Sequence, residues 1–145
     1  MENNNVETIC ELNCNVDDMT GEAIGFAMER LFDAGALEVY TVPIGMKKSR
    51  PGILIHVVCR EKDKETILHT IFKYTTTLGI RENLIRRYAL ERRIETVETS
   101  YGPIRCKVSD GYGVERRKYE YDDIARIAKE NDLSIETVLE NIEKK

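Results

Sequence analysis

The chain has 145 residues, 41% of them hydrophobic and 33% charged, a composition typical of one globular domain, or of one domain with a small appendage. Its 22 Lys and Arg against 26 Asp and Glu leave a net charge of −4, which excludes the broadly basic surface of generic nucleic-acid or anionic-membrane binders. No apolar run approaches the ~20 residues of a membrane helix, and Met1 to Val6 carry no cationic-then-apolar signal, so we expect a cytoplasmic protein with neither nucleic acid nor membrane as partner.

The first half of the chain alternates between strand and helix patterns. Residues 6–16 alternate polar and apolar and predict a strand with one wet face. A helical stripe from Ala23 to Phe32 follows, with Asp18 or Thr20 as its cap and Gly35 at its end. Apolar runs at 37–44 and 53–59 predict two strands around a Gly-, Pro- and Lys-rich turn at 45–52. A second helix is predicted over 63–74, with Ile67, Leu68, Ile71 and Phe72 facing inward.

The second half of the chain completes this pattern and adds a hairpin and two helices. An extended stretch from Gly79 to about Thr99 turns at residues 101–103 and returns over 104–108. The order β-α-β-β-α-β is that of a ferredoxin-like α+β fold, with an extra hairpin strand. We therefore predict a ferredoxin-like domain over 1–108, a linker over 109–120 and a C-terminal helical pair over 121–145, with helices at about 121–131 and 135–143.

The C-terminal helical pair has the spacing of a helix-turn-helix but the wrong charge. Its second helix would carry Glu136, Glu140 and Glu143 toward the phosphates, so DNA binding is disfavoured. Docking on the sheet, or assembly, is the favoured interpretation. Since a ferredoxin-like sheet has edges that a partner can cover, we expect a homo-oligomer.

The four cysteines, Cys10, Cys14, Cys59 and Cys106, form no C-x-x-C pair. They are predicted to be small buried hydrophobic residues, and nickel or zinc ligation by Cys10 and Cys14 is the alternative. The two histidines also lack ligand spacing, and we expect structural or surface roles for them.

Three polar segments could carry chemistry. The pair Asp17-Asp18, between the first strand and first helix, could hold a divalent cation or cap the helix. The cationic turn from Lys47 to Arg50 suits phosphate or carboxylate groups, but is equally typical of a solvated hairpin tip. The segment 75–79, with Arg81 behind it, offers hydroxyl donors, although threonines that enter a strand are the simpler explanation.

These segments lie in longer motifs: NVDDMTGE (15–22), LFDAGALEVYTVPIGMKKSRPG (31–52) and TTTLGIR (75–81). In them the sequence resembles the LarC nickel-insertion family, and ETSYGPIRCKV (98–108) and KYEYDDIARIA (118–128) resemble it too. The motifs follow the family's order over nearly the whole chain and match its C-terminal half. The resemblance implies a protein that uses CTP and a divalent cation to insert nickel into a pyridinium bis-thiocarboxylic acid mononucleotide. The product is the nickel-pincer cofactor of lactate racemase, and the C-terminal half is the part that binds CTP.

The resemblance also favours a functional role for the three polar segments over a structural one. It implies a CTP-dependent nickel chelatase, or cyclometallase, that works with the family's N-terminal half. Mg²⁺ or Mn²⁺ would be held by Asp17 and Asp18 while cations and hydroxyls contact the triphosphate. The nucleotide-binding set is then Lys47, Lys48, Arg50, Thr75, Thr76, Thr77, Gly79 and Arg81. Lys118 and Glu120 fall in a further polar motif of no assigned role.

Two departures from the family pattern qualify this expectation. Asn13 and Cys14 stand where an acidic residue and a threonine are usual, which removes one acidic contribution. The family's N-terminal half has no counterpart here, so we expect this chain to bind and activate CTP, with insertion depending on that half as partner. A non-catalytic module that senses a nucleotide or metal, or that mediates oligomerisation, is the alternative on the same fold.

Overall fold

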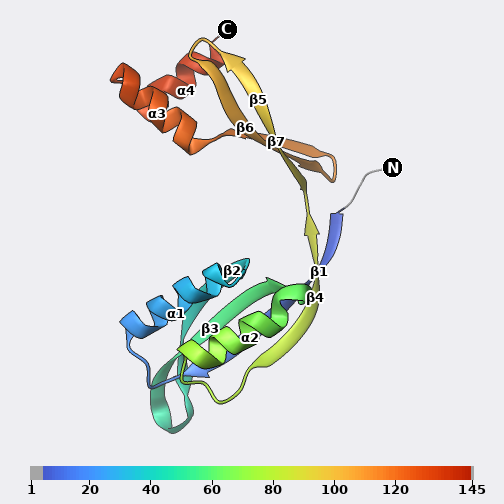
Figure 1. Cartoon of the computed structure of the whole chain (residues 1–145), viewed down its shortest axis with the longest axis vertical. Helices are drawn as coiled ribbons and strands as arrows, with labels where there is room; N and C mark the ends of the chain where they lie inside the picture. Colours follow the sequence, from blue (N-terminus) through green and yellow to red (C-terminus); the bar gives the residue numbers. More distant parts are fainter. Residues whose placement is uncertain (1–4, 145) are drawn as a thin grey trace. The chain divides into compact units, whose positions relative to one another are not determined.

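The computed structural model describes residues 5–144, which divide into two compact units, one over Val6–Arg87 and one from Tyr88 onward. No helix within those residues has the length and apolarity needed to cross a membrane. The residues that carry the cytoplasmic prediction, Met1 to Val6, fall mostly outside the described part of the chain. Figure 1 follows the chain from blue to red through both units.

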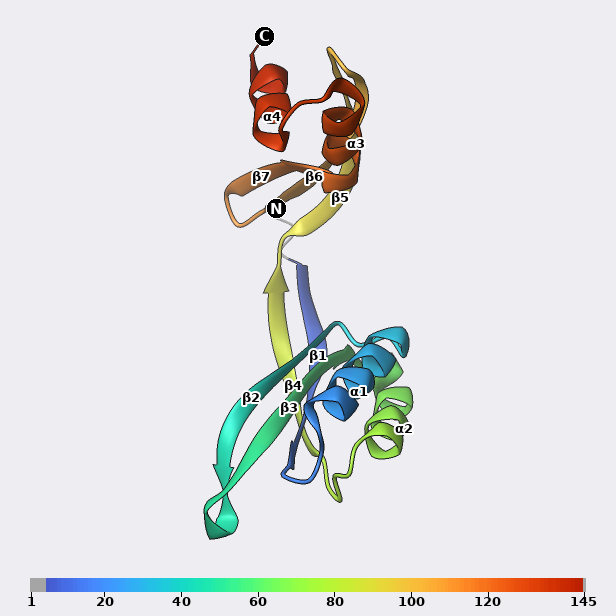
Figure 2. The ribbon, with the colours of Figure 1, turned by 90° about the vertical axis from the view of Figure 1, so that its left-hand side faces the viewer.

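The first unit is a four-stranded sheet with two helices on one face, as the turned view of Figure 2 shows. Its elements are β1 (Asn5–Val16), α1 (Gly21–Asp33), β2 (Glu38–Met46), β3 (Arg50–Arg60), α2 (Lys64–Tyr74) and β4 (Arg81–Ala89), with short 3₁₀ turns at Lys47–Ser49 and Glu61–Asp63. The strand order is β2-β3-β1-β4, and β3 runs antiparallel to both β1 and β2. This arrangement confirms the predicted α+β fold and its ferredoxin-like order.

Burial in this unit follows the alternation of β1. Cys10, Leu12 and Cys14 on one face of that strand are at most 1% exposed, and they pack against Leu31 of α1 and Ile71 of α2. Thr20 caps α1 by accepting a hydrogen bond from the amide of Ala23. Two residues of the predicted apolar stripes are exposed instead, Phe32 of α1 at 47% and Phe72 of α2 at 50%. The buried positions are Ile24, Ala27 and Leu31 in α1, and Ile67 and Ile71 in α2.

The second unit is a three-stranded antiparallel sheet with a pair of helices. It comprises β5 (Glu91–Thr99), β6 (Gly102–Gly111), β7 (Val114–Tyr119), α3 (Tyr121–Asn131) and α4 (Ile135–Glu143). Ile104 of β6 is buried against Ile124, Ile127 and Val138 of the two helices. The predicted helical pair is therefore present at the predicted residues.

The boundaries of the second unit correct two predictions. The extended stretch from Gly79 to Thr99 is divided at Leu90, so that β4 joins the first sheet and β5 the second. The expected linker over 109–120 instead contains the end of β6 and all of β7. β7 has the sequence VERRKY, whose charges conceal the strand pattern, and backbone pairing with β6 forms it.

Candidate functional site

A hollow of about 330 Å³ lies where the end of β1 meets the loop between α2 and β4. β1 and β4 are neighbours in the sheet, so residues just after β1 and just before β4 are brought together from distant parts of the chain. The hollow is lined by Asn15, Val16, Asp17, Asp18, Thr76, Thr77, Leu78, Gly79 and Arg81. Six of the residues predicted for the site are in this set.

Two contacts tie the acidic end of β1 to the threonine segment and to β4. The hydroxyl of Thr76 donates a hydrogen bond to Oδ1 of Asp18. The guanidinium of Arg81 donates to Oδ1 of Asn15 at 3.1 Å. The site thus places carboxylates, a hydroxyl and a guanidinium around one hollow, which suits an anion together with a hard cation.

The three threonines of the loop have different roles. The Thr75 hydroxyl donates to the carbonyl of Ile71 at 2.8 Å and so helps to end α2. The Thr77 hydroxyl donates to the carbonyl of Gly79 at 2.8 Å and shapes the loop. Thr76 is the one whose hydroxyl contacts an acidic residue, whereas Thr75 does not line the hollow.

The basic turn between β2 and β3 reaches the site through one residue. Nη1 of Arg50 lies 3.7 Å from Oδ2 of Asp17. Lys47 and Lys48 are exposed in the 3₁₀ turn and do not line the hollow. Lys48 has φ of 60° and Ser49 has φ of 58°, so two consecutive non-glycine residues adopt the left-handed conformation that sets the direction of this turn. The structure therefore joins Arg50, but neither lysine, to the hollow.

The carboxylates at this site suit a divalent cation that is shared with a ligand. The described residues contain no group of three or more His, Cys, Asp or Glu side chains placed to hold a metal ion. Asp17 and Asp18 would supply two oxygen ligands, and a bound phosphate and water would supply the others, as is usual for Mg²⁺.

Asn15 and Leu78 line the hollow but were not among the predicted site residues. Asn15 lies on the wet face of β1, two residues before Asp17, and that alternation is the signal that could have found it. Leu78 is fully exposed, at 100%, beside the polar groups of the loop. No periodic pattern in the sequence marks it.

The cysteines and His56 have structural surroundings. All four cysteines are buried, as predicted, and burial is the main cause that raises the pKa of Cys10 to about 12 and raises the pKa of Cys14. A neutral thiol is a poor metal ligand, so this environment disfavours the nickel or zinc alternative. His56 is 8% exposed, stacks on Tyr40 and lies with Nδ1 2.6 Å from Oδ1 of Asn13.

The chain is similar to nickel insertion proteins over most of its length. The family described as nickel insertion protein matches residues 1–139. A "pyridinium-3,5-bisthiocarboxylic acid mononucleotide nickel insertion protein" of Alkaliphilus metalliredigens is 43% identical over 133 residues, 92% of this chain and 32% of the relative. A protein of the same name from Acetivibrio thermocellus is 39% identical over 95% of this chain and 34% of its own length. The chain thus spans about a third of the length of these curated relatives.

Two solved structures are also similar. One is described as "LarC2, the C-terminal domain of a cyclometallase involved in the synthesis of the NPN cofactor of lactate racemase, apo form". It is 34% identical, has a TM-score of 0.81, and the match covers 94% of this chain and 95% of that one. A protein of Methanopyrus kandleri AV19, 24% identical with a TM-score of 0.75 over 95% of this chain and 86% of its own, shares the fold.

Proposed function

The chain belongs to the nickel insertion protein family, at its C-terminal domain, and from that premise we propose that its hollow binds CTP together with Mg²⁺ or Mn²⁺. The reaction served would be the insertion of nickel into the pyridinium bis-thiocarboxylic acid mononucleotide. The observation that carries the proposal is the convergence of Asp17, Asp18 and Arg81 around one hollow, with Arg50 beside it.

The role of each side chain at the site would follow from its charge. Asp17 and Asp18 would hold the divalent cation, whose chemistry is to draw charge from the triphosphate oxygens. Arg50 and Arg81 would neutralise those oxygens as the α-phosphorus is attacked and pyrophosphate leaves. The hydroxyls of Thr76 and Thr77 and the backbone at Gly79 would position the phosphates. Lys47 and Lys48 would take part only from the exposed end of the turn.

The family's N-terminal half is proposed as the partner that completes insertion. This chain corresponds to about a third of its curated relatives, and two carboxylates are a small ligand set for a complete metallation centre. We therefore assign binding and activation of CTP to this chain, and completion of nickel transfer to the chain together with the N-terminal half.

Thermal unfolding of the chain with different nucleotides tests the assignment. CTP with Mn²⁺ is expected to raise the unfolding temperature more than ATP or GTP with Mn²⁺, or than Mn²⁺ alone, because only a ligand bound to the folded state stabilises it. An equal rise with every nucleotide would contradict the choice of CTP.

The second candidate function is a module that binds nucleotide without turnover. The absence of a third His, Cys, Asp or Glu side chain beside Asp17 and Asp18, among residues 5–144, favours it. Pyrophosphate release in the presence of the N-terminal half, nickel and the mononucleotide separates the two. Release supports the nickel chelatase, and binding without release supports the module.

A further inference from the structure

The three-stranded sheet of the second unit has one face on which charges are paired. This face carries the buried Ile104, Cys106 and Val108, and around them five charged side chains join in ion pairs. The pairs are Arg93–Glu95 at 2.9 Å, Arg93–Asp110 at 3.1 Å, Arg117–Glu95 at 3.0 Å and Arg117–Glu115 at 2.9 Å. Each of these two arginines and three carboxylates is therefore paired within the face.

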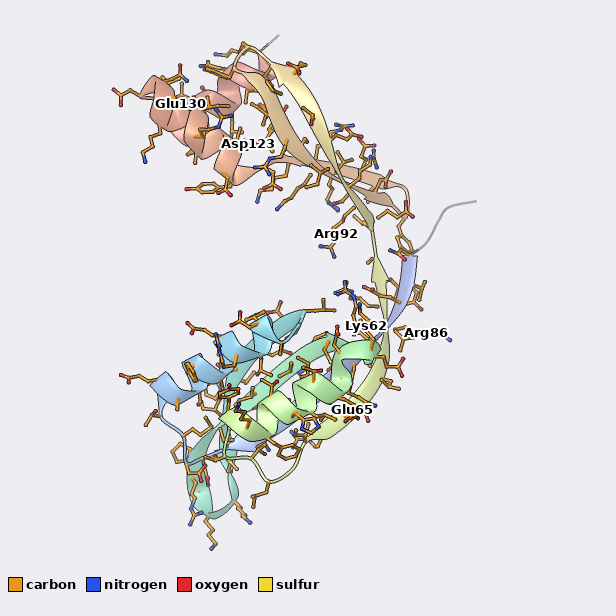
Figure 3. All side chains as sticks on the ribbon, viewed as in Figure 1. Lys62, Glu65, Arg86, Arg92, Asp123 and Glu130 are labelled. Carbon is orange, nitrogen blue, oxygen red and sulfur yellow. The ribbon has the colours of Figure 1, made fainter. Side chains whose placement is uncertain are left out.

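The opposite face of the same sheet is positive. Because side chains alternate along a strand, residues in register across the three strands share a face. One row across the sheet is Arg92, Ser109 and Arg116, and the next row is Ile94, Lys107 and Lys118. We call the four cations of these rows, Arg92, Lys107, Arg116 and Lys118, the basic face. Figure 3 shows Arg92 extending away from its strand.

In the described part of the chain, most cations of the basic face have no carboxylate beside them. Lys107 lies 3.4 Å from Oε1 of Glu120, while the other three cations form no ion pair among the residues that the structure describes. Lys107 and Lys118 are directly opposite each other in the ladder, an arrangement of like charges that destabilises a sheet. A bound anion would relieve this repulsion.

The polar motif around Lys118 and Glu120, which the CTP site does not use, belongs to this face. Lys118 supplies one cation, and Glu120 holds Lys107 in place beside it. Three residues later, Asp123 holds Arg105 through a bidentate ion pair, with contacts of 2.8 and 3.1 Å, where β6 meets α3. The motif therefore fixes the positions of cations along β6, which is a role that a solvated strand would not require.

The shape of the basic face suits a small aromatic anion rather than a long polyanion. A hollow of about 240 Å³ is lined by Arg92, Ile94, Lys107 and Ser109, together with Arg93. Ile94, which lines this hollow, is 59% exposed and offers an apolar surface to a ring. The cations and the Ser109 hydroxyl around it offer donors to phosphate and carboxylate oxygens.

We propose that the basic face binds the second substrate of the proposed reaction, a pyridinium mononucleotide, through its phosphate and its ring-bound acid groups. This inference rests on the proposed function for the identity of the substrate, but on a different unit of the chain for its site. In it, Arg92 and Lys118 contact the anionic groups, Ile94 contacts the ring, and Glu120 acts as a positioning residue for Lys107.

Calorimetric titration of the full chain with nicotinic acid mononucleotide, a stable pyridinium carboxylate with one phosphate, tests the proposal. Wild type is expected to bind it, and the double variant Arg92→Gln/Lys118→Gln to bind at least about tenfold more weakly, since it loses two charge-assisted contacts. The matched control, Arg126→Gln/Lys129→Gln, removes the same charge from the exposed surface of α3 and should bind within about twofold of wild type.

Titrations with other compounds show which chemical groups of the ligand the basic face recognises. Nicotinamide riboside, which lacks the phosphate and the carboxylate, should not bind, and inorganic phosphate should bind weakly and compete. Equal affinity of the two double variants, or binding of a single-stranded oligonucleotide that outcompetes the mononucleotide, would overturn the proposal. Stabilisation by Mn²⁺ and CTP should persist in both double variants. Its absence from the wild type would instead count against the CTP site alone.

Discussion

Arg50 and Asp17 are 33 residues apart in sequence, yet their side chains lie 3.7 Å apart across the end of the four-stranded sheet. The register explains the approach: Val16 at the end of β1 is opposite Ile53 of β3, three residues after Arg50. The ion pair holds a guanidinium beside a carboxylate. A cation on Asp17 would free Arg50 for the phosphate oxygens of the same ligand.

Replacing either residue of the acidic pair should weaken nucleotide binding without unfolding the chain. Asp17→Asn and Asp18→Asn each remove a charged oxygen that is proposed to bind the cation, so the affinity for Mn²⁺ and CTP is expected to fall at least about tenfold. The thermal shift with Mn²⁺ and CTP measures this. The control, Glu22→Gln, changes an acidic residue of α1 that does not line the hollow, and should retain the shift. A full thermal shift in both Asp variants would show that these carboxylates do not bind the ligand.

Two adjacent residues of α2 should differ sharply in their contribution to stability. Ile71 is 1% exposed in the core, so Ile71→Ala should lower the free energy of unfolding by about 2–5 kcal/mol. Phe72 is 50% exposed, and Phe72→Ala should cost less than about 1.5 kcal/mol. Urea unfolding of both variants gives the comparison. Equal losses would mean that α2 presents a different face to the sheet.

The helices were the part of the fold that the sequence predicted best. The apolar spacing in residues 121–131 and 135–143 is local, and the helices form at those residues. The break at Leu90 and the strand Val114–Tyr119 were not predictable in this way. Both depend on pairing with β6, a contact between segments, and neither carries a local apolar pattern.

The site was also predicted where single residues carry the signal, and missed where it depends on contacts between distant segments. Residue chemistry identified Asp17, Asp18 and Arg81, all of which line the hollow. Residue chemistry also favoured Lys47 and Lys48, which the left-handed turn leaves away from it. Asn15 was overlooked because an amide on a wet strand face has no special signature until β4 brings Arg81 to it.

The thiols should be unreactive until the chain unfolds. All four cysteines are buried out of reach of a disulfide reagent. Burial also raises the pKa of Cys10 to about 12, so the reactive thiolate of Cys10 is scarce at pH 8. Titration with Ellman's reagent is expected to detect almost no rapidly reacting thiol in the native protein, and all four in guanidinium chloride. A rapidly reacting thiol in the native protein would show that one of these positions is accessible.

Acid should weaken the contact between β6 and α3 over a defined range of pH. Hydrogen bonds from the guanidinium and the backbone amide of Arg105 lower the pKa of Asp123 from 3.8 to about 2. The folded state therefore favours the ionised carboxylate more than the unfolded state does. The stability that this carboxylate contributes to the fold is complete above about pH 4 and is lost as the pH falls through 2. Asp123→Asn should therefore unfold at a lower temperature than wild type at pH 7, and the difference should shrink toward pH 2. Asp122→Asn, at the exposed neighbouring position, is the control and should follow the wild-type profile. If the difference for Asp123→Asn stayed constant from pH 7 to pH 2, the ionised carboxylate would not be the source of the stabilisation.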